Sequence, residues 1–168
     1  MTGRDEFRKV VLTEAQISAA EKILKEFAAK TGSSAVILGD MTGQILAKYG
    51  GLLDRDLEIF SVLAASNFVA TAEMAKQIGE KTSFEVLFHE GELRSIYLLS
   101  LNEKYLLEII FKSSIPPGTI RIYSKQAKAK LLEVIASEEV EVDLSNIFDD
   151  NFSALLDEQL TKTLGEKK

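Results

Sequence analysis

The stretch at residues 54–78 constrains the fold most, because its apolar residues cover more of a helical circumference than one packing partner can hide. At three- and four-residue spacing, one stripe holds Leu57, Phe60, Ala64, Phe68, Thr71, Ala75 and Ile78. A second stripe, apolar or small until its last turn, holds Ile59, Val62, Ser66, Val69 and Glu73. The spacing predicts a helix. Its second stripe is either buried within one domain or meets a second chain, and a contiguous apolar surface favours the second chain.

Turn and cap residues divide the rest of the chain into a regular order of elements. Thr13 and Gln16 fit a capping box that starts a helix ending at Gly32. Pro117 is suited to the first turn of a last helix of about 20 residues. Between the helices, turn-bounded apolar runs predict strands over 35–39, 44–49, 84–88, 93–101 and 105–111. The order α-β-β-α-β-β-β-α predicts an α+β fold of the α/β/α sandwich type, one five-stranded antiparallel sheet with helices on both faces.

The strand over 84–88 supports the interface reading of the helix. Its alternation places Phe84, Val86 and Phe88 on one face. Such a strand at the edge of a sheet invites aggregation unless another strand pairs with it. Pairing of this strand and burial of the second stripe together predict a two-fold dimer.

Charge is unevenly distributed along the chain. The 168 residues include 26 acidic and 20 basic side chains, and residues 138–150 hold acids but no Lys or Arg. This acidic balance argues against nucleic acid, which rewards a basic surface. No cysteine is available for disulfides. No apolar run approaches the ~20 residues of a membrane span, and the N-terminus lacks the apolar centre of a signal peptide. We expect a cytoplasmic protein without membrane insertion.

The candidate catalytic motifs in the sequence lack the residues or the spacing that an active site needs. The one histidine, His89, adjoins Glu90 and the turn residue Gly91, and a structural role in a hairpin is expected for it. Residues 79–82 lack the spacing of a phosphate-binding loop, and the aspartates of the tail do not match a calcium-binding loop. The sequence therefore predicts no enzyme of its own, no cofactor and no metal.

Three short motifs carry a family resemblance. D-M-T-G-Q at 40–44, A-K-Q-I-G-E at 75–80 and F-H-E-G at 88–91 stand in this element order. Together they resemble the Roadblock/dynein light chain superfamily, and within it the MglB-like bacterial regulators of small polarity GTPases. The resemblance runs from about residue 10 to 136 and returns in the tail at I-F-D-D, 147–150.

The resemblance implies a homodimer with its second helices side by side and its third strands joined into one sheet. The dimer interface expected from it comprises Ile59, Leu63, Asn67, Phe84, Val86 and Phe88. MglB-like dimers bind an MglA-like small GTPase and activate its hydrolysis by positioning the GTPase's own residues. Arg94 and Arg121 do not stand on flexible loops, so an arginine finger is not expected.

GTPase contacts implied by the resemblance lie on the helix and in the tail. They are Val62, Ser66, Val69, Ala70, Glu73, Phe152, Leu155, Leu156 and Leu160. Val69 and Glu73 depart from the family, which usually has very small residues there. They favour the alternative function, a Roadblock scaffold dimer that binds a GTPase or another protein without stimulating hydrolysis.

The C-terminal part of the chain is expected to be an appendage. The predicted division is a Roadblock domain at 1–136, an acidic linker at 137–150 and an amphipathic helix at 151–168. Its apolar stripe spans about 14 residues, and a helix of about that length is marginal alone in water, where roughly 12–15 residues is the lower limit. It should dock on the GTPase or on its own dimer, and the resemblance implies a role in nucleotide exchange.

Overall fold

Eight helices and strands follow one another in the part of the chain that the structure, a computed structural model, describes: residues 11–51 and 54–137. They are α1 (Glu14–Thr31), β1 (Ala35–Asp40), β2 (Ile45–Gly50), α2 (Asp54–Gln77), β3 (Val86–His89), β4 (Arg94–Ser100), β5 (Tyr105–Lys112) and α3 (Pro117–Ala136). The predicted element order and fold class are confirmed.

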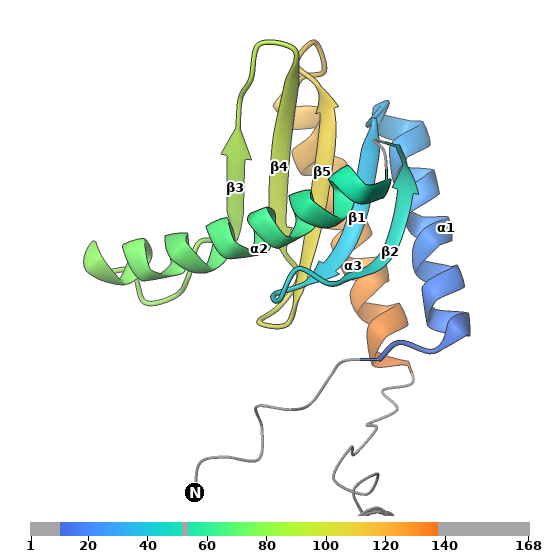
Figure 1. The fold of residues 1–168 in the computed structure, drawn as a ribbon, viewed down its shortest axis with the longest axis horizontal. Coiled ribbons are helices and arrows are strands. Elements are labelled where there is room, and N and C mark those ends of the chain that lie inside the picture. Colours follow the sequence, from blue (N-terminus) through green and yellow to red (C-terminus); the bar gives the residue numbers. More distant parts are fainter. Residues whose placement is uncertain (1–10, 52–53, 138–168) are drawn as a thin grey trace, which may run out of the picture. The chain divides into compact units, whose positions relative to one another are not determined.

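The strands form one antiparallel sheet in the order β2-β1-β5-β4-β3, so β2 and β3 are its two edges. The central strand β5 is buried except at its last residue. Helix α2 runs across one face of the sheet, and α1 and α3 lie together on the other (Figure 1). Leu57 of α2 packs on Ile37 and Ile110, and Phe68 packs on Leu98 and Leu106.

One glutamine connects the start of α1 to the end of α3. The predicted capping box is present: Gln16 donates its backbone N–H to Thr13 Oγ1 (3.2 Å), and the Thr13 N–H donates to Gln16 Oε1 (2.8 Å). The Gln16 amide also donates to the carbonyl oxygens of Val134 and Ile135, each at 3.1 Å. Both carbonyls lie in the last turn of α3, where the helix itself supplies few donors. The Val134 carbonyl oxygen also accepts from the backbone N–H (3.4 Å) and the hydroxyl (2.7 Å) of the cap residue Ser137. Gly32, with φ +73°, ends α1 as predicted.

Strand β3 begins later than the sequence predicts. Pairing with β4 starts at Val86 opposite Leu99, so Phe84 lies outside the strand, and His89 belongs to the strand rather than to the hairpin loop. Glu85, just before the strand, still accepts a hydrogen bond from the Ser100 N–H through its carbonyl oxygen (2.9 Å), and Phe84 lies beyond this last backbone contact with β4. The Glu85 carboxylate binds Lys128 of α3 at 2.8 Å.

Gly50 and Gly51 test how closely the end of β2 approaches the residues at the start of β1. Gly50 has φ +84°, and a Cβ there would collide with the Ser34 carbonyl oxygen, whereas a Cβ on Gly51 meets nothing within 4 Å. Gly50→Ala should lower the free energy of unfolding by about 1–3 kcal/mol. Gly51→Ala should change it by less than about 0.5 kcal/mol. Urea midpoints measure both, and equal midpoints would contradict this assignment of strain.

Candidate interaction surface

The outward side of α2 is apolar along most of its length. Ile59, Val62, Leu63, Val69 and Met74 are between 49% and 63% exposed. Ser66 and Ala70 lie exposed among them. We call these residues the α2 outer face: Ile59, Val62, Leu63, Ser66, Val69, Ala70 and Met74. Exposed apolar area of this continuity is typical of a protein-binding surface.

The inward side of α2 forms the core beneath it. Leu57, Ala64, Phe68 and Ala75 of the first predicted stripe are buried. Ile78 follows the end of the helix and is 71% exposed, so it does not join this core. The first predicted stripe therefore packs on the sheet, and the second faces away from it.

Because both sides of α2 are apolar, its mean hydropathy resembles that of a membrane-spanning helix. Residues Asp56–Gln77 are long and apolar enough to cross a membrane by those criteria alone, although no such run stood out in the sequence. The mean hydropathy is high because both sides contribute to it. Since Leu57 and Phe68 form part of the core, the helix is accounted for as one layer of the fold.

Strand β3 presents the second apolar feature. Within the described residues its one strand neighbour is β4. Val86 and Leu87 are half-buried, and Phe88 is 39% exposed and stacks on Phe111 with ring centroids 6.3 Å apart. An edge this short still leaves a row of backbone groups able to pair with another strand.

A polar contact joins β3 to α2. Asn67 Nδ2 lies 2.9 Å from His89 Nε2, so His89 contacts the helix, whereas the sequence predicts a structural role within the hairpin. The contact also brings Asn67 to the edge that carries Phe88. Helix α2 crosses the sheet and continues past β3 (Figure 1), so the second half of the helix lies beside this edge.

Of the predicted dimer residues, Ile59, Leu63 and Asn67 lie on α2, and Val86 and Phe88 lie on β3. Phe84 precedes β3 and is half-buried. Val62, Ser66, Val69, Ala70 and Glu73 are all exposed on α2. Phe152, Leu155, Leu156 and Leu160 lie outside the described residues.

The opposite edge, β2, is built differently. A bulge interrupts the pairing of β2 with β1, where the register shifts between Leu38 and Gly39 of β1. Lys48 is a residue of β2 itself. A hollow of about 500 Å³ follows this edge and is flanked by the carboxylates Glu21 of α1 and Glu58 of α2. Bulges and charges are the devices by which proteins keep an edge strand from pairing.

Glu73 is solvated rather than buried. Its carboxylate binds Lys76 Nζ at 2.6 Å, one helical turn away, and both side chains are about two-thirds exposed. An exposed pair of this kind contributes little to stability. Glu73 therefore places a local charge pair beside Val69 on an otherwise apolar surface.

A contact between layers fixes the start of β3. Lys128 Nζ donates to Glu85 Oε1 and to the Ser100 carbonyl oxygen, both at 2.8 Å. The hydrogen bond and the charge of Lys128 lower the pKa of Glu85 below its ordinary value, and the charges of Lys125 and Arg121 add to this effect. The basic strip on α3 thus holds the chain where it enters the edge strand.

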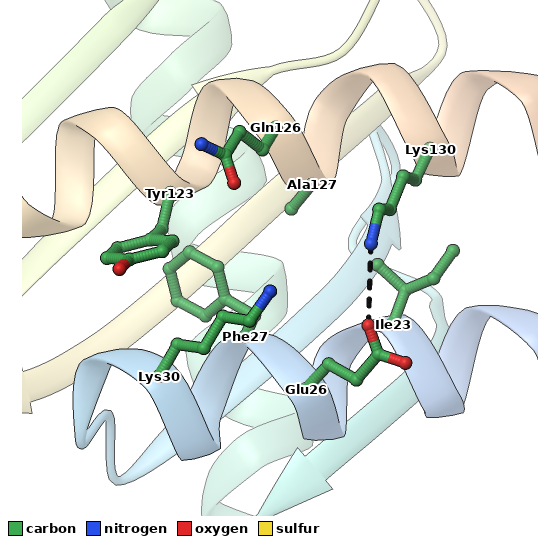
Figure 2. Close-up of a pocket in the computed structure, with 8 residues that line it drawn as sticks. All are labelled: Ile23, Glu26, Phe27, Lys30, Tyr123, Gln126, Ala127 and Lys130. Carbon is green, nitrogen blue, oxygen red and sulfur yellow. Dashed lines mark hydrogen bonds and ion pairs between the residues drawn. The ribbon is translucent and has the colours of Figure 1, made fainter.

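The seam between α1 and α3 holds a dent of about 20 Å³, lined by Phe27, Tyr123, Gln126 and their neighbours (Figure 2). Lys130 Nζ reaches Glu26 Oε2 across it at 3.4 Å. Small-molecule sites are typically 300–1,000 Å³. The dent is a packing imperfection with room for about one water molecule.

Metal-binding clusters are absent from the described part of the chain. Over residues 11–51 and 54–137, no three His, Asp or Glu side chains are placed to hold a metal ion. Arg94 and Arg121 are exposed, and they stand on β4 and α3 rather than on loops. What this part of the chain offers a partner is apolar surface and an open strand edge.

More than half of the chain matches a known domain family. The family model described as "Roadblock/LC7 domain" matches residues 19–111, which is more than half of the chain. The match begins within α1 and ends within β5.

Three solved structures resemble the chain in fold and sequence. One is described as "MglB with tetrameric arrangement", with 30% identity, a TM-score of 0.70, and coverage of 76% of this chain and 96% of that one. The gliding protein MglB from Thermus thermophilus has 28% identity and a TM-score of 0.70, covering 78% and 98%. Myxococcus xanthus MglB has 27% identity and a TM-score of 0.67, covering 71% and 96%.

Lys128 and Lys130 form a matched pair for testing how the start of β3 is held. Lys128→Ala removes the contacts with Glu85 and Ser100, and Lys130→Ala removes a longer and more exposed ion pair. Lys128→Ala should lower the free energy of unfolding by about 1 kcal/mol and speed hydrogen exchange in β3. Lys130→Ala should change stability by less than about 0.5 kcal/mol. The opposite ranking in urea denaturation would show that β3 is held by other contacts.

Proposed function

The chain belongs to the Roadblock/LC7 domain family, and we propose that it is a homodimeric regulator that binds an MglA-like small GTPase and stimulates its GTP hydrolysis. The observation that carries the proposal is the α2 outer face beside the open edge of β3. The likeness to MglB structures supports it.

The contrast between the two sheet edges supports β3 as the site of pairing. At β2 the bulge, Lys48 and the flanking carboxylates oppose an incoming strand. Strand β3 has no bulge and carries Val86, Leu87 and Phe88 in a row, and the carboxylates that border it, Glu85 and Glu90, lie outside the strand itself. A two-fold axis beside β3 pairs that strand with its own copy, so the sheet continues from one protomer into the next. The same axis brings the two α2 helices together, with Ile59, Leu63 and Asn67 proposed at their contact.

The paired α2 helices then make one apolar platform for the GTPase. Val62, Ser66, Val69, Ala70 and Glu73 are the proposed contacts on it. A partner surface of this kind stimulates hydrolysis without donating a catalytic residue if it binds the competent switch conformation of the GTPase more tightly than the others. The ratio between its affinities for the competent and the other switch conformations sets how strongly it stimulates hydrolysis.

The tail has a proposed role of its own. Phe152, Leu155, Leu156 and Leu160 form an apolar stripe in the sequence, and we propose that they bind the GTPase and promote nucleotide exchange. Removing residues 138–168 should slow exchange of a fluorescent GDP analogue while the GTPase is still bound. An unchanged exchange rate would remove this part of the proposal.

Phe88 and Tyr49 allow a matched test of the dimer, because both aromatic side chains are 39% exposed and they lie on opposite sheet edges. Phe88→Lys places an unpaired charge in the proposed interface and should weaken dimerisation on the order of a hundredfold. Tyr49→Lys should leave it within about threefold of the wild type. Sedimentation equilibrium measures both, and circular dichroism confirms that each variant is folded. A dimer weakened by Tyr49→Lys alone would place the interface at β2.

Val69 and Ile122 test the GTPase platform in the same way. Both are exposed aliphatic residues, 52% and 62% exposed, on helices that cover opposite faces of the sheet. In single-turnover phosphate release with an MglA-like GTPase, Val69→Asp should reduce stimulation by about tenfold or more, as expected for a central contact. Ile122→Asp should leave it unchanged. Equal losses from the two variants would contradict the proposed platform.

The bulk of Val69 and the Glu73–Lys76 pair favour a second candidate, a scaffold dimer that binds a GTPase without activating it. The same phosphate-release assay separates the two functions. A wild-type protein that binds the GTPase in a pull-down but leaves its hydrolysis rate unchanged is a scaffold.

A further inference from the structure

A carboxyl group lies fully buried between α2 and the sheet. Glu108, in the middle of β5, has no exposed surface. Its Oε1 accepts a hydrogen bond from the Ser61 hydroxyl of α2 at 2.7 Å, and its Oε2 has no hydrogen-bond partner among the described residues. Buried charges are costly unless they are paired, so this group needs a reason to be there.

The neighbouring strand is shaped to admit this carboxyl. A Cβ on Gly39 of β1 would lie 2.7 Å from Glu108 Oε1 and 3.1 Å from Ser61 Oγ. Three elements therefore meet at one point, where a glycine, a serine and a glutamate leave room for each other. The site is built into the packing of α2.

Within the described part of the chain, no basic side chain lowers the pKa of Glu108. From β1, Asp40 faces it, and the Asp40 carboxylate already accepts hydrogen bonds from the Thr42 hydroxyl and from the backbone N–H groups of Thr42 and Gln44. From β2, Lys48 lies in the same row of the sheet but on the far side of Ile37. Arg94 of β4 is exposed, as are the described charged side chains of α2: Asp56, Glu58, Glu73 and Lys76. Burial, opposed in part by the Ser61 hydrogen bond and assisted by Asp40, raises the pKa of Glu108 to about 7.

We propose that Glu108 is a pH-responsive latch beneath α2, which holds the helix on the sheet while it is neutral and loosens the helix when it ionises. The neutral acid accepts the Ser61 hydrogen bond at little cost. In the seated helix, the ionised carboxylate has a single hydrogen-bond donor, Ser61, and lies near the carboxylate of Asp40. The ionised form is therefore more stable where water can hydrate it. Water reaches it when α2 lifts from the sheet. Because α2 also carries the outer face, the latch couples proton concentration to the surface that a partner meets.

The sign of the effect follows from linkage. The folded-state pKa is about 7 against an ordinary value of 4.5, so between these values the seated state binds more protons than the lifted state. The seating of α2 is therefore strongest below pH 4.5 and weakens as the pH rises to about 7 and beyond. From pH 6 to pH 8, the equilibrium for lifting α2 should increase about tenfold.

Hydrogen exchange measured by NMR tests the latch on the full chain. Protection factors, which already remove the intrinsic effect of pH on exchange, should fall about tenfold between pH 6 and pH 8 for residues 57–68. In Glu108→Gln, which keeps an acceptor for Ser61 but does not titrate, they should be independent of pH. The control Glu103→Gln, at an exposed position, should behave as the wild type.

Ser61→Ala gives a second, independent reading. Losing the hydroxyl removes a contact that stabilises the ionised form, so the midpoint of loosening should move to higher pH. The ¹³C shift of the Glu108 carboxyl reports its titration directly. The proposal is overturned if Glu108→Gln and wild type lose protection equally, or if the carboxyl titrates near 4.5 while α2 stays protected. The measurements read α2 itself and need no GTPase, so they stand apart from the proposed function.

Discussion

Apolar character on two sides of α2 is the constraint on which the rest of the structure depends. Its inner side covers the sheet through Leu57, Ala64 and Phe68, and its outer side repeats the apolar character without a partner among the described residues. A helix amphipathic in the ordinary sense needs one core. This one needs a core and an interface, and the open edge of β3 lies where the interface would begin.

The two edges of the sheet express the same division. Edge β2 is interrupted by a bulge, while β3 is uninterrupted, apolar over Val86–Phe88, and joined to α2 through Asn67 and His89. The opposite layer also contributes, because Lys128 fixes the chain just before β3 begins. Contacts from both layers therefore define the edge that we propose to pair.

Local chemistry made most of the fold predictable. The capping box at Thr13 and Gln16, the glycine after α1 and the prolines before α3 act within a few residues, and all of them stand in the structure as expected. The late start of β3 was missed because alternation within the strand does not show where its pairing with β4 begins. The contact between Asn67 and His89 was also missed, since no local pattern encodes a pairing across 22 residues. Glu108 reads in the sequence as a polar residue of a strand, and its burial depends on α2 crossing over it and on Gly39 in the adjacent strand.

Pairing through β3 is the central claim, and a distance between protomers tests it most directly. The chain contains no cysteine, so spin labels can be placed at Glu90→Cys, beside β3, or at Tyr49→Cys, on β2. With strands about 4.8 Å apart, pairing at β3 predicts a distance below about 25 Å between the Glu90 labels and about 40 Å or more between the Tyr49 labels. Pulsed electron paramagnetic resonance measures both distances in solution. A short distance between the Tyr49 labels with a long one between the Glu90 labels would contradict the account.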